Sequence, residues 1–149
     1  MVKFSGAIIW TNDLVRMQLF YENMLNLKPH SVRDNFIAYR WHDLRFSIGL
    51  HSDVHGSSKE PFRIMLNFDV PDIQEVTDLL KNNGVTFLRN PEKEHWGGWV
   101  STFLDPDGNT IQLLQQPDLY SSSKPGFLKL TAPLRYTFTI SAEDLSVFT

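Results

Sequence analysis

The segment WVSTFLDPDGNTIQLLQ, residues 99–115, decides how this chain folds. Two apolar runs, residues 99–104 and 110–115, flank the sequence Asp-Pro-Asp-Gly-Asn at 105–109. Proline in the second position presets φ, and Asp, Gly and Asn tolerate turn conformations, so we predict a turn that joins two antiparallel strands. A calcium-binding EF-hand loop does not fit, because it requires Gly and Glu at its sixth and twelfth positions, where Thr110 and Gln116 stand.

The composition limits the class of protein. The chain has 149 residues, 42% of them hydrophobic and 21% charged, which suits a globular protein with its own core. A net charge of −3 gives no electrostatic basis for binding nucleic acid or an anionic membrane. The lack of cysteine excludes disulfides, thiolate metal sites and a cysteine nucleophile. No apolar run is long enough to span a membrane, and no signal-peptide core follows Met1, so we expect a cytoplasmic protein.

Residues 5–115 contain one pattern of elements twice. In the first copy, residues 5–11 are an apolar strand, and Asn12 or Asp13 can cap a helix whose apolar positions from Leu14 recur at helical spacing. Residues 28–33, 36–41 and 44–51 have strand composition, and the last of these alternates between apolar and polar positions. The first copy is therefore predicted to be strand–helix–strand–strand–strand.

The second copy repeats this order. Alternation over 64–70 predicts a strand, and Asp72 precedes a helix that ends at Gly84. Strands follow at 85–88, 99–104 and 110–115, with a loop at 89–96. We expect modules at 1–52 and 61–117, a linker at 53–60, and a C-terminal extension at 118–149 made of a linker and strand-like segments.

Residues 105–114 resemble the last hairpin of the vicinal oxygen chelate superfamily, the group of glyoxalase I, bleomycin-resistance proteins and extradiol dioxygenases. Residues 20–27 (Phe-Tyr-Glu-Asn-Met-Leu-Asn-Leu) are similar to the end of its first helix, and Trp-Gly-Gly-Trp at 96–99 fits before the penultimate strand. This resemblance covers about residues 4–116 and implies an α+β fold of two βαβββ modules whose curled mixed sheets form a cup. Many members are dimers, so we expect a homodimer.

In metal-dependent members, four cup-facing positions on the first and last strands of the modules hold the ligands, usually His and Glu. Carried over by position, these are Gly6 and Gly49 in the first module and Met65 and Gln112 in the second. Glycine offers no ligand atom, a thioether suits Cu(I), and a neutral amide alone does not hold a divalent ion. The resemblance therefore predicts a protein without a metal cofactor.

Two histidines are the candidates for catalysis. His51 shares the polar face of its strand with Arg45 and Ser47, and His95 lies beside Trp96 in a loop. A histidine can act as a general base near neutral pH. An ordinary surface histidine is the alternative for each, so it stays open whether the protein is an enzyme.

The alternation of side chains along the strands also separates residues expected to line the cup from residues expected to pack in the core. One phase of the strands is wholly apolar and suits packing under helices, whereas the other mixes aromatic, amide and cationic side chains. We expect the mixed phase to bind a small aromatic or amphipathic molecule, with Arg45 or Arg63 available for a carboxylate or phosphate. The ligand-binding candidates are Trp10, Arg45, Ser47, His51, Arg63, Met65, Asn67, Trp96, Gln112 and Leu114.

Four functions remain open at this level. The first is metal-independent binding of a small organic molecule in the cup. The second is an enzyme without metal that uses His51 or His95. The third is a metal-dependent dioxygenase, lyase or isomerase with displaced ligands, and the fourth is an interaction module whose cup is filled by side chains.

Overall fold

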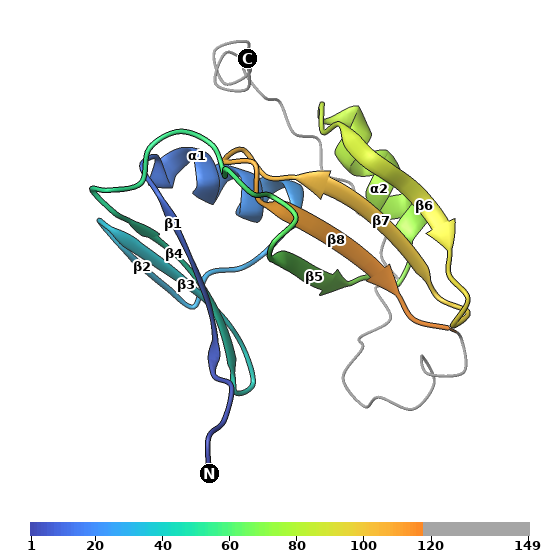
Figure 1. Cartoon of the computed structure of the whole chain (residues 1–149), viewed down its shortest axis with the longest axis horizontal. Helices are drawn as coiled ribbons and strands as arrows, with labels where there is room; N and C mark the ends of the chain where they lie inside the picture. Colours follow the sequence, from blue (N-terminus) through green and yellow to red (C-terminus); the bar gives the residue numbers. More distant parts are fainter. Residues whose placement is uncertain (118–149) are drawn as a thin grey trace.

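The computed structural model describes residues 1–117 and has an α+β fold (Figure 1). The first module consists of β1 (Gly6–Thr11), helix α1 (Leu14–Leu19), its π-helical continuation η1 (Phe20–Met24), β2 (Ser31–Arg33), β3 (Phe36–Trp41) and β4 (Leu44–Leu50). The second consists of β5 (Met65–Asp69), α2 (Ile73–Asn82), β6 (Phe87–Lys93), β7 (Trp99–Leu104) and β8 (Thr110–Gln115). The predicted βαβββ order therefore occurs twice. The extension predicted at 118–149 lies outside the described residues.

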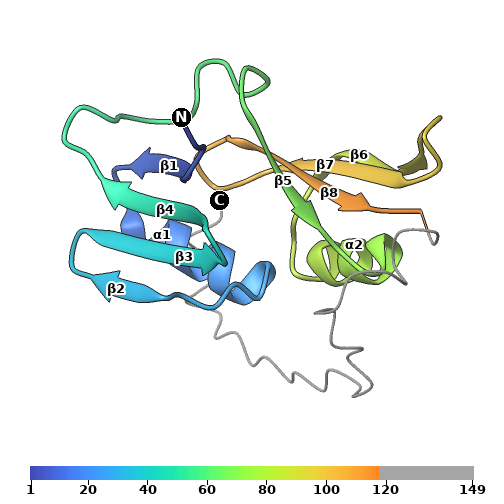
Figure 2. The same ribbon diagram turned by 90° about the horizontal axis from the view of Figure 1, so that it is seen from below.

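Each module forms one four-stranded mixed sheet. Sheet A has the strand order β1-β4-β3-β2, and sheet B has the equivalent order β5-β8-β7-β6. The first strand of each module runs parallel to the last, and the remaining pairs are antiparallel. β7 and β8 are the antiparallel pair predicted on either side of the 105–109 turn. The strands β1 and β5 lie at sheet edges (Figure 2).

Both helices begin where the sequence predicts. The side chain of Asp13 accepts a hydrogen bond from the backbone N–H of Arg16, and Asp72 accepts from those of Gln74 and Glu75. These N-caps satisfy donors that the first helical turn leaves unpaired. No helix within residues 1–117 has the length and apolarity needed to cross a bilayer.

Side chains alternate between the two faces of each sheet, and we call the face toward the helices inner and the opposite face outer. The inner faces are mostly apolar and consist of Ala7, Ile9, Ile37, Tyr39, Phe46 and Ile48 in sheet A, and Leu66, Phe68, Ser101, Phe103, Ile111 and Leu113 in sheet B. The outer faces are mixed and consist of Ile8, Trp10, Ser31, Arg33, Phe36, Ala38, Arg40, Arg45, Ser47 and Gly49 in sheet A, and Met65, Asn67, Asp69, Val100, Thr102, Leu104, Thr110, Gln112 and Leu114 in sheet B.

The two sheets meet through their inner faces. Phe68 of sheet B packs against Phe46 and Trp41 of sheet A, at ring-centroid distances of 6.1 and 6.4 Å. Tyr21 of η1 lies against both Phe46 and Phe68, so one hydrophobic core runs through both modules. The outer faces consequently turn away from this shared core, and the two sheets do not close into a cup within one chain.

Two elements differ from their predicted bounds. The helix that starts at Leu14 changes to π-helix over Phe20–Met24, and this wider turn brings Phe20, Tyr21 and Met24 into the core together. β6 continues to Lys93, so the prediction of a strand at 85–88 followed by a loop at 89–96 was wrong. Two register shifts between Phe87 and Glu92 let this edge strand contain Pro91, which lacks a backbone donor.

Candidate functional site

The acidic turn is a buried centre of hydrogen bonds. Oδ1 of Asp105 accepts from the backbone N–H groups of Asp107 and Asn109 at 3.0 and 2.8 Å, and these bonds form the turn. Its Oδ2 accepts from the Tyr21 hydroxyl at 2.9 Å. Burial raises the pKa of Asp105, while the hydrogen bonds from Asn109 and Tyr21 oppose that rise. Burial likewise raises the pKa of Tyr21, and the nearby charge of Asp105 adds to it.

A second acidic residue of the turn faces the same helix. Asp107 forms an ion pair with Arg16 of α1, and both members are largely shielded from solvent. The oxygens of Asp105 are occupied by protein donors, and the charge of Asp107 is balanced by Arg16. The turn therefore links the two modules and has no ligand set for a cation. In the described part of the chain, no three His, Asp or Glu side chains converge on a point where a metal could bind.

The positions carried over from metal-dependent relatives can be compared through strand register. Met65 pairs with Thr110, so Gln112 stands two residues beyond this partner on β8. Gly6 pairs with Arg45, and the residue two positions beyond Arg45 on β4 is Ser47. Ser47, and not the predicted Gly49, is therefore the position in the first module that corresponds to Gln112 in the second. The corrected set of Gly6, Ser47, Met65 and Gln112 has no imidazole and no carboxylate, so it does not fit a divalent ion.

Gly49 instead provides room for an aromatic cluster on the outer face of sheet A. A Cβ at this position would lie 2.6 Å from the Trp10 indole and 2.9 Å from the Phe36 ring, so both rings rest directly on the backbone. Trp10 contacts Phe36 at a centroid distance of 6.4 Å and His51, edge to face, at 5.3 Å. Trp10 is nevertheless 43% exposed, so its indole offers an open aromatic surface.

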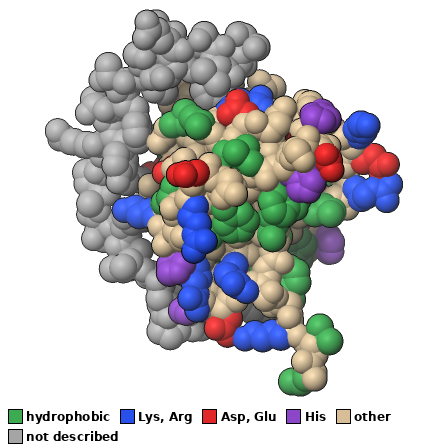
Figure 3. All heavy atoms as spheres, turned by 90° about the vertical axis from the view of Figure 1, so that its left-hand side faces the viewer, with side chains coloured by type: hydrophobic (Ala, Val, Ile, Leu, Met, Phe, Trp, Pro, Cys, Tyr) green, Lys and Arg blue, Asp and Glu red, His purple; other side chains and the backbone are tan. Residues whose placement is uncertain are grey.

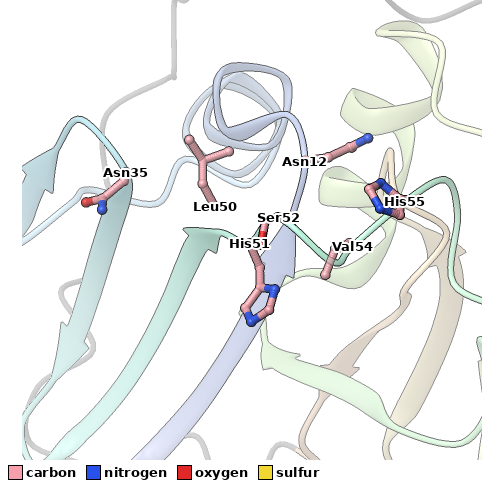
Figure 4. A pocket seen from close by; sticks show the side chains of 7 residues that line it. All are labelled: Asn12, Asn35, Leu50, His51, Ser52, Val54 and His55. Carbon is pink, nitrogen blue, oxygen red and sulfur yellow. The ribbon is translucent and has the colours of Figure 1, made fainter.

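His51 lies at the end of β4, beside a shallow hollow of about 320 Å³ lined by Asn12, Asn35, Leu50, His51, Ser52, Val54 and His55 (Figure 4). Its Nδ1 accepts a hydrogen bond from the Asp53 backbone N–H at 3.2 Å. In this arrangement the neutral ring carries its proton on Nε2, so it presents a donor to a ligand rather than a base. Figure 4 shows His55 apart from His51, with Val54 between them. His95 lies in the loop between β6 and β7, far along the chain from this hollow and absent from its lining.

The arginines fall into two groups. Arg63 lies in the turn before β5 and forms an ion pair with Glu60, and Arg89 on β6 pairs with Glu92 and Glu94. The hydrogen bonds that Arg89 donates to Glu92 and Glu94 raise the pKa of its guanidinium. Arg45 and its cross-strand neighbour Arg40 stand on the outer face of sheet A, and within residues 1–117 neither forms an ion pair.

The outer face of sheet B carries a polar row across its strands. Asn67 pairs with Gln112, and Gln112 pairs with Thr102. The Gln112 side chain donates to the Thr102 hydroxyl at 3.3 Å. Leu114 lies one step further along this face. Trp96 sits outside the row, because its indole covers the Gly98 backbone at the base of β7.

The candidates therefore separate into two surfaces. Trp10, Arg45, Ser47 and His51 belong to sheet A, and Met65, Asn67, Gln112 and Leu114 belong to the outer face of sheet B. Sequence reasoning missed Phe36, Arg40 and Thr102, which the register places among them. The alternation of 36–41 contained a signal for the first two, because Phe36, Ala38 and Arg40 share one phase.

The chain is similar to known proteins over most of its length. A family model described as Glyoxalase/Bleomycin resistance protein/Dioxygenase superfamily matches residues 3–113. No curated protein matches the chain.

Solved structures share the fold. A protein of unknown function from Agrobacterium tumefaciens str. C58 has a TM-score of 0.64 and 23% identity, over 78% of this chain and 95% of that one. A glyoxalase/bleomycin resistance protein/dioxygenase family enzyme from Burkholderia phytofirmans PsJN has a TM-score of 0.61 and 19% identity, over 74% and 96%. A member of the same superfamily from Sphaerobacter thermophilus DSM 20745 has a TM-score of 0.60 and 23% identity, over 78% and 98%. The family match and these folds confirm the resemblance that the 105–114 hairpin suggested: the chain belongs to the Glyoxalase/Bleomycin resistance protein/Dioxygenase superfamily.

Proposed function

We propose that this protein binds a small aromatic or amphipathic organic molecule, without a metal ion, in a cup that two copies of the chain form together. The observation that carries the proposal is the outer face of sheet A. There an open indole rests on Gly49, beside polar and cationic side chains, and the ligand positions of metal-dependent relatives hold no metal-binding groups. Pockets for organic ligands combine such apolar surface with a few polar anchors.

The way the two sheets meet supports the pairing of two copies. Because the inner faces enclose the core of the single chain, its two outer faces cannot cover each other. They carry exposed apolar side chains, among them Ile8 at 52% and Met65 at 39%. Pairing the outer face of sheet A in one copy with that of sheet B in another would bury these side chains. A two-fold axis makes this contact twice and so creates two equivalent cups.

The edge strands β1 and β5, each of which has one paired neighbour within residues 1–117, support the same arrangement. Each lies at an edge of its sheet and leaves a row of backbone groups open. Phe62 and Ile64, which lead into β5, are 62% and 73% exposed. A second copy is an occupant that could cover these groups while it supplies the opposite wall of the cup.

Two measurements test the proposal. Light scattering after size exclusion should give the mass of a dimer at micromolar concentration. A thermal-shift screen with small aromatic acids, amides and amines should find ligands that raise the melting temperature equally with and without a chelator, because binding to the folded state alone stabilises it. A monomer, or a shift that requires added divalent metal, would contradict the proposal.

A matched pair of tryptophan variants locates the binding. Trp10 and Trp99 are similarly exposed, at 43% and 37%. Trp99 lies two residues before Ser101 on β7 and therefore on the inner face of sheet B, not on an outer face. Trp10→Leu should abolish the ligand-induced shift, and Trp99→Leu should leave it intact. Equal loss in both variants would place the ligand elsewhere.

A further inference from the structure

The outer face of sheet A holds three arginines, and two of them, Arg40 and Arg45, have an unusual arrangement. Arg40 and Arg45 are direct cross-strand partners on β3 and β4. Like charges placed opposite each other on antiparallel strands are destabilising. Among the arginines of residues 1–117, Arg16, Arg63 and Arg89 have acidic partners, whereas Arg40 donates to the carbonyl oxygen of His42 and neither Arg40 nor Arg45 forms an ion pair. Within residues 1–117 this pair of like charges therefore has no counter-ion.

We propose that the outer face of sheet A selects an elongated aromatic carboxylate, with the carboxylate between Arg40 and Arg45 and the aromatic ring on the Trp10 indole. This deepens the proposed function and rests on it. The planar fork of a guanidinium matches the two oxygens of a carboxylate, so two arginines can hold one such group through several charge-assisted hydrogen bonds.

The aromatic end of the proposed binding site is the cluster of rings that covers Gly49. Phe36 and His51 hold the Trp10 indole from two sides, and its remaining surface is open. An aromatic ring of the ligand can lie against this indole, as aromatic pairs prefer offset or edge contacts. The Nε2–H of His51 stands beside it as a donor.

The length of the ligand follows from the strand register. Arg45 and Gly49 lie on the same face four residues apart, which corresponds to about 13 Å along β4. The row between them is formed by Ile8, Ala38 and Ser47, whose small or apolar side chains suit a hydrocarbon linker. Figure 3 looks onto this side of the molecule, where Lys and Arg side chains gather below a hydrophobic centre. A compact aryl acid cannot contact both ends.

Isothermal titration calorimetry with three probes tests this inference. Naphthylbutanoate has the required ring, linker and carboxylate, naphthylbutanamide lacks only the charge, and naphthoate lacks only the linker. We expect naphthylbutanoate to bind at least about tenfold more tightly than either of the other probes. The amide loses the charge-assisted hydrogen bonds to the arginines, and naphthoate is too short to contact both ends of the site. Its affinity should fall with added salt, while that of the amide stays constant.

Two variants assign the preference to the arginine pair. Arg45→Gln should remove the advantage of the butanoate and leave the amide affinity unchanged, which also shows that the variant is folded. Arg89→Gln is the matched control, because Arg89 lies on β6, at the opposite edge of sheet B from β5, and is already paired with Glu92 and Glu94, so this variant should retain the full preference. If butanoate and amide bind wild type equally, or if Arg45→Gln keeps the preference, the inference is wrong and the proposed function stands. If none of the probes binds, both are wrong.

Discussion

The hydroxyl of Tyr21 offers a sensitive test of how the two modules are joined. It donates to Oδ2 of Asp105 at 2.9 Å, and the two residues come from η1 and from the turn between β7 and β8. Tyr21→Phe removes this one bond and keeps the ring contacts with Phe46 and Phe68. We predict a clear loss of stability without loss of the fold.

The magnitude follows from burial. Tyr21 has no exposed surface and Asp105 is 4% exposed, so water cannot replace the lost donor. A hydrogen bond to a charged group contributes about 1.5–3 kcal/mol, and Asp105 keeps its bond from the Asn109 amide at 2.9 Å. We therefore expect a decrease of about 2 kcal/mol in the free energy of unfolding, which corresponds to roughly 4–8 °C in melting temperature for a protein of this size.

Urea unfolding followed by circular dichroism measures this difference, and Tyr39→Phe is the control. Tyr39 is also fully buried, and burial together with the charge of Glu22 raises its pKa, but its hydroxyl makes no well-formed hydrogen bond to this carboxylate or to another group of residues 1–117. Removing the Tyr39 hydroxyl should therefore cost clearly less stability than removing that of Tyr21. If Tyr21→Phe lost less than about 0.5 kcal/mol, or no more than Tyr39→Phe, the link between the modules would not be the bond described here.

Two further predictions concern pH and backbone packing. Burial raises the pKa of Tyr21 above its ordinary value of 10. The stability that the neutral hydroxyl contributes is therefore fully present below about pH 10 and is lost as the pH rises through the pKa of Tyr21 in the folded protein. The melting temperature of wild type should fall more steeply above pH 10 than that of Tyr21→Phe. Substitutions at Gly6 and Gly49 should differ strongly in their effect on folding. A Cβ at Gly6 would lie 1.9 Å from the Arg45 carbonyl oxygen, at a φ of +151°, whereas the atoms nearest to one at Gly49 belong to the Trp10 and Phe36 rings. Gly6→Ala should prevent parallel pairing of β1 with β4 and abolish folding, while Gly49→Ala should cost about 1–3 kcal/mol and shift the Trp10 emission; equal effects on circular dichroism and melting would refute this assignment.

The sequence predicts the fold where local chemistry is unambiguous. The two Asp N-caps, the alternating strand 44–51 and the turn at 105–109 each fix an element by short-range rules, and together they specify a repeated module. β6 was mispredicted because Pro91 and the charged residues around it have loop composition, and only its pairing with β7 permits a bulged strand there.

The site was harder to predict because it depends on register between strands and on contacts between modules. Alternation identified Trp10 and Arg45 as residues of one face, but the partner of Arg45 is Arg40, which only the β3–β4 pairing reveals. Gly49 was interpreted as a lost metal ligand, and the structure gives it a different role as the support of Trp10. The acidic segment was correctly predicted as a turn. Its hydrogen bond with Tyr21, however, joins residues 84 positions apart, and no short-range pattern in the sequence indicates such a contact.

Mixing two defective variants tests most directly whether two chains share the cup. Arg45→Gln damages the outer face of sheet A, and Asn67→Trp blocks that of sheet B, so neither variant alone should bind naphthylbutanoate with wild-type affinity. After unfolding and refolding the two together in equal amounts, half of the dimers are mixed, and each mixed dimer contains one intact cup. The account predicts that about a quarter of the sites bind naphthylbutanoate with wild-type affinity. No recovery of binding would show that each site is built within a single chain and would contradict the account.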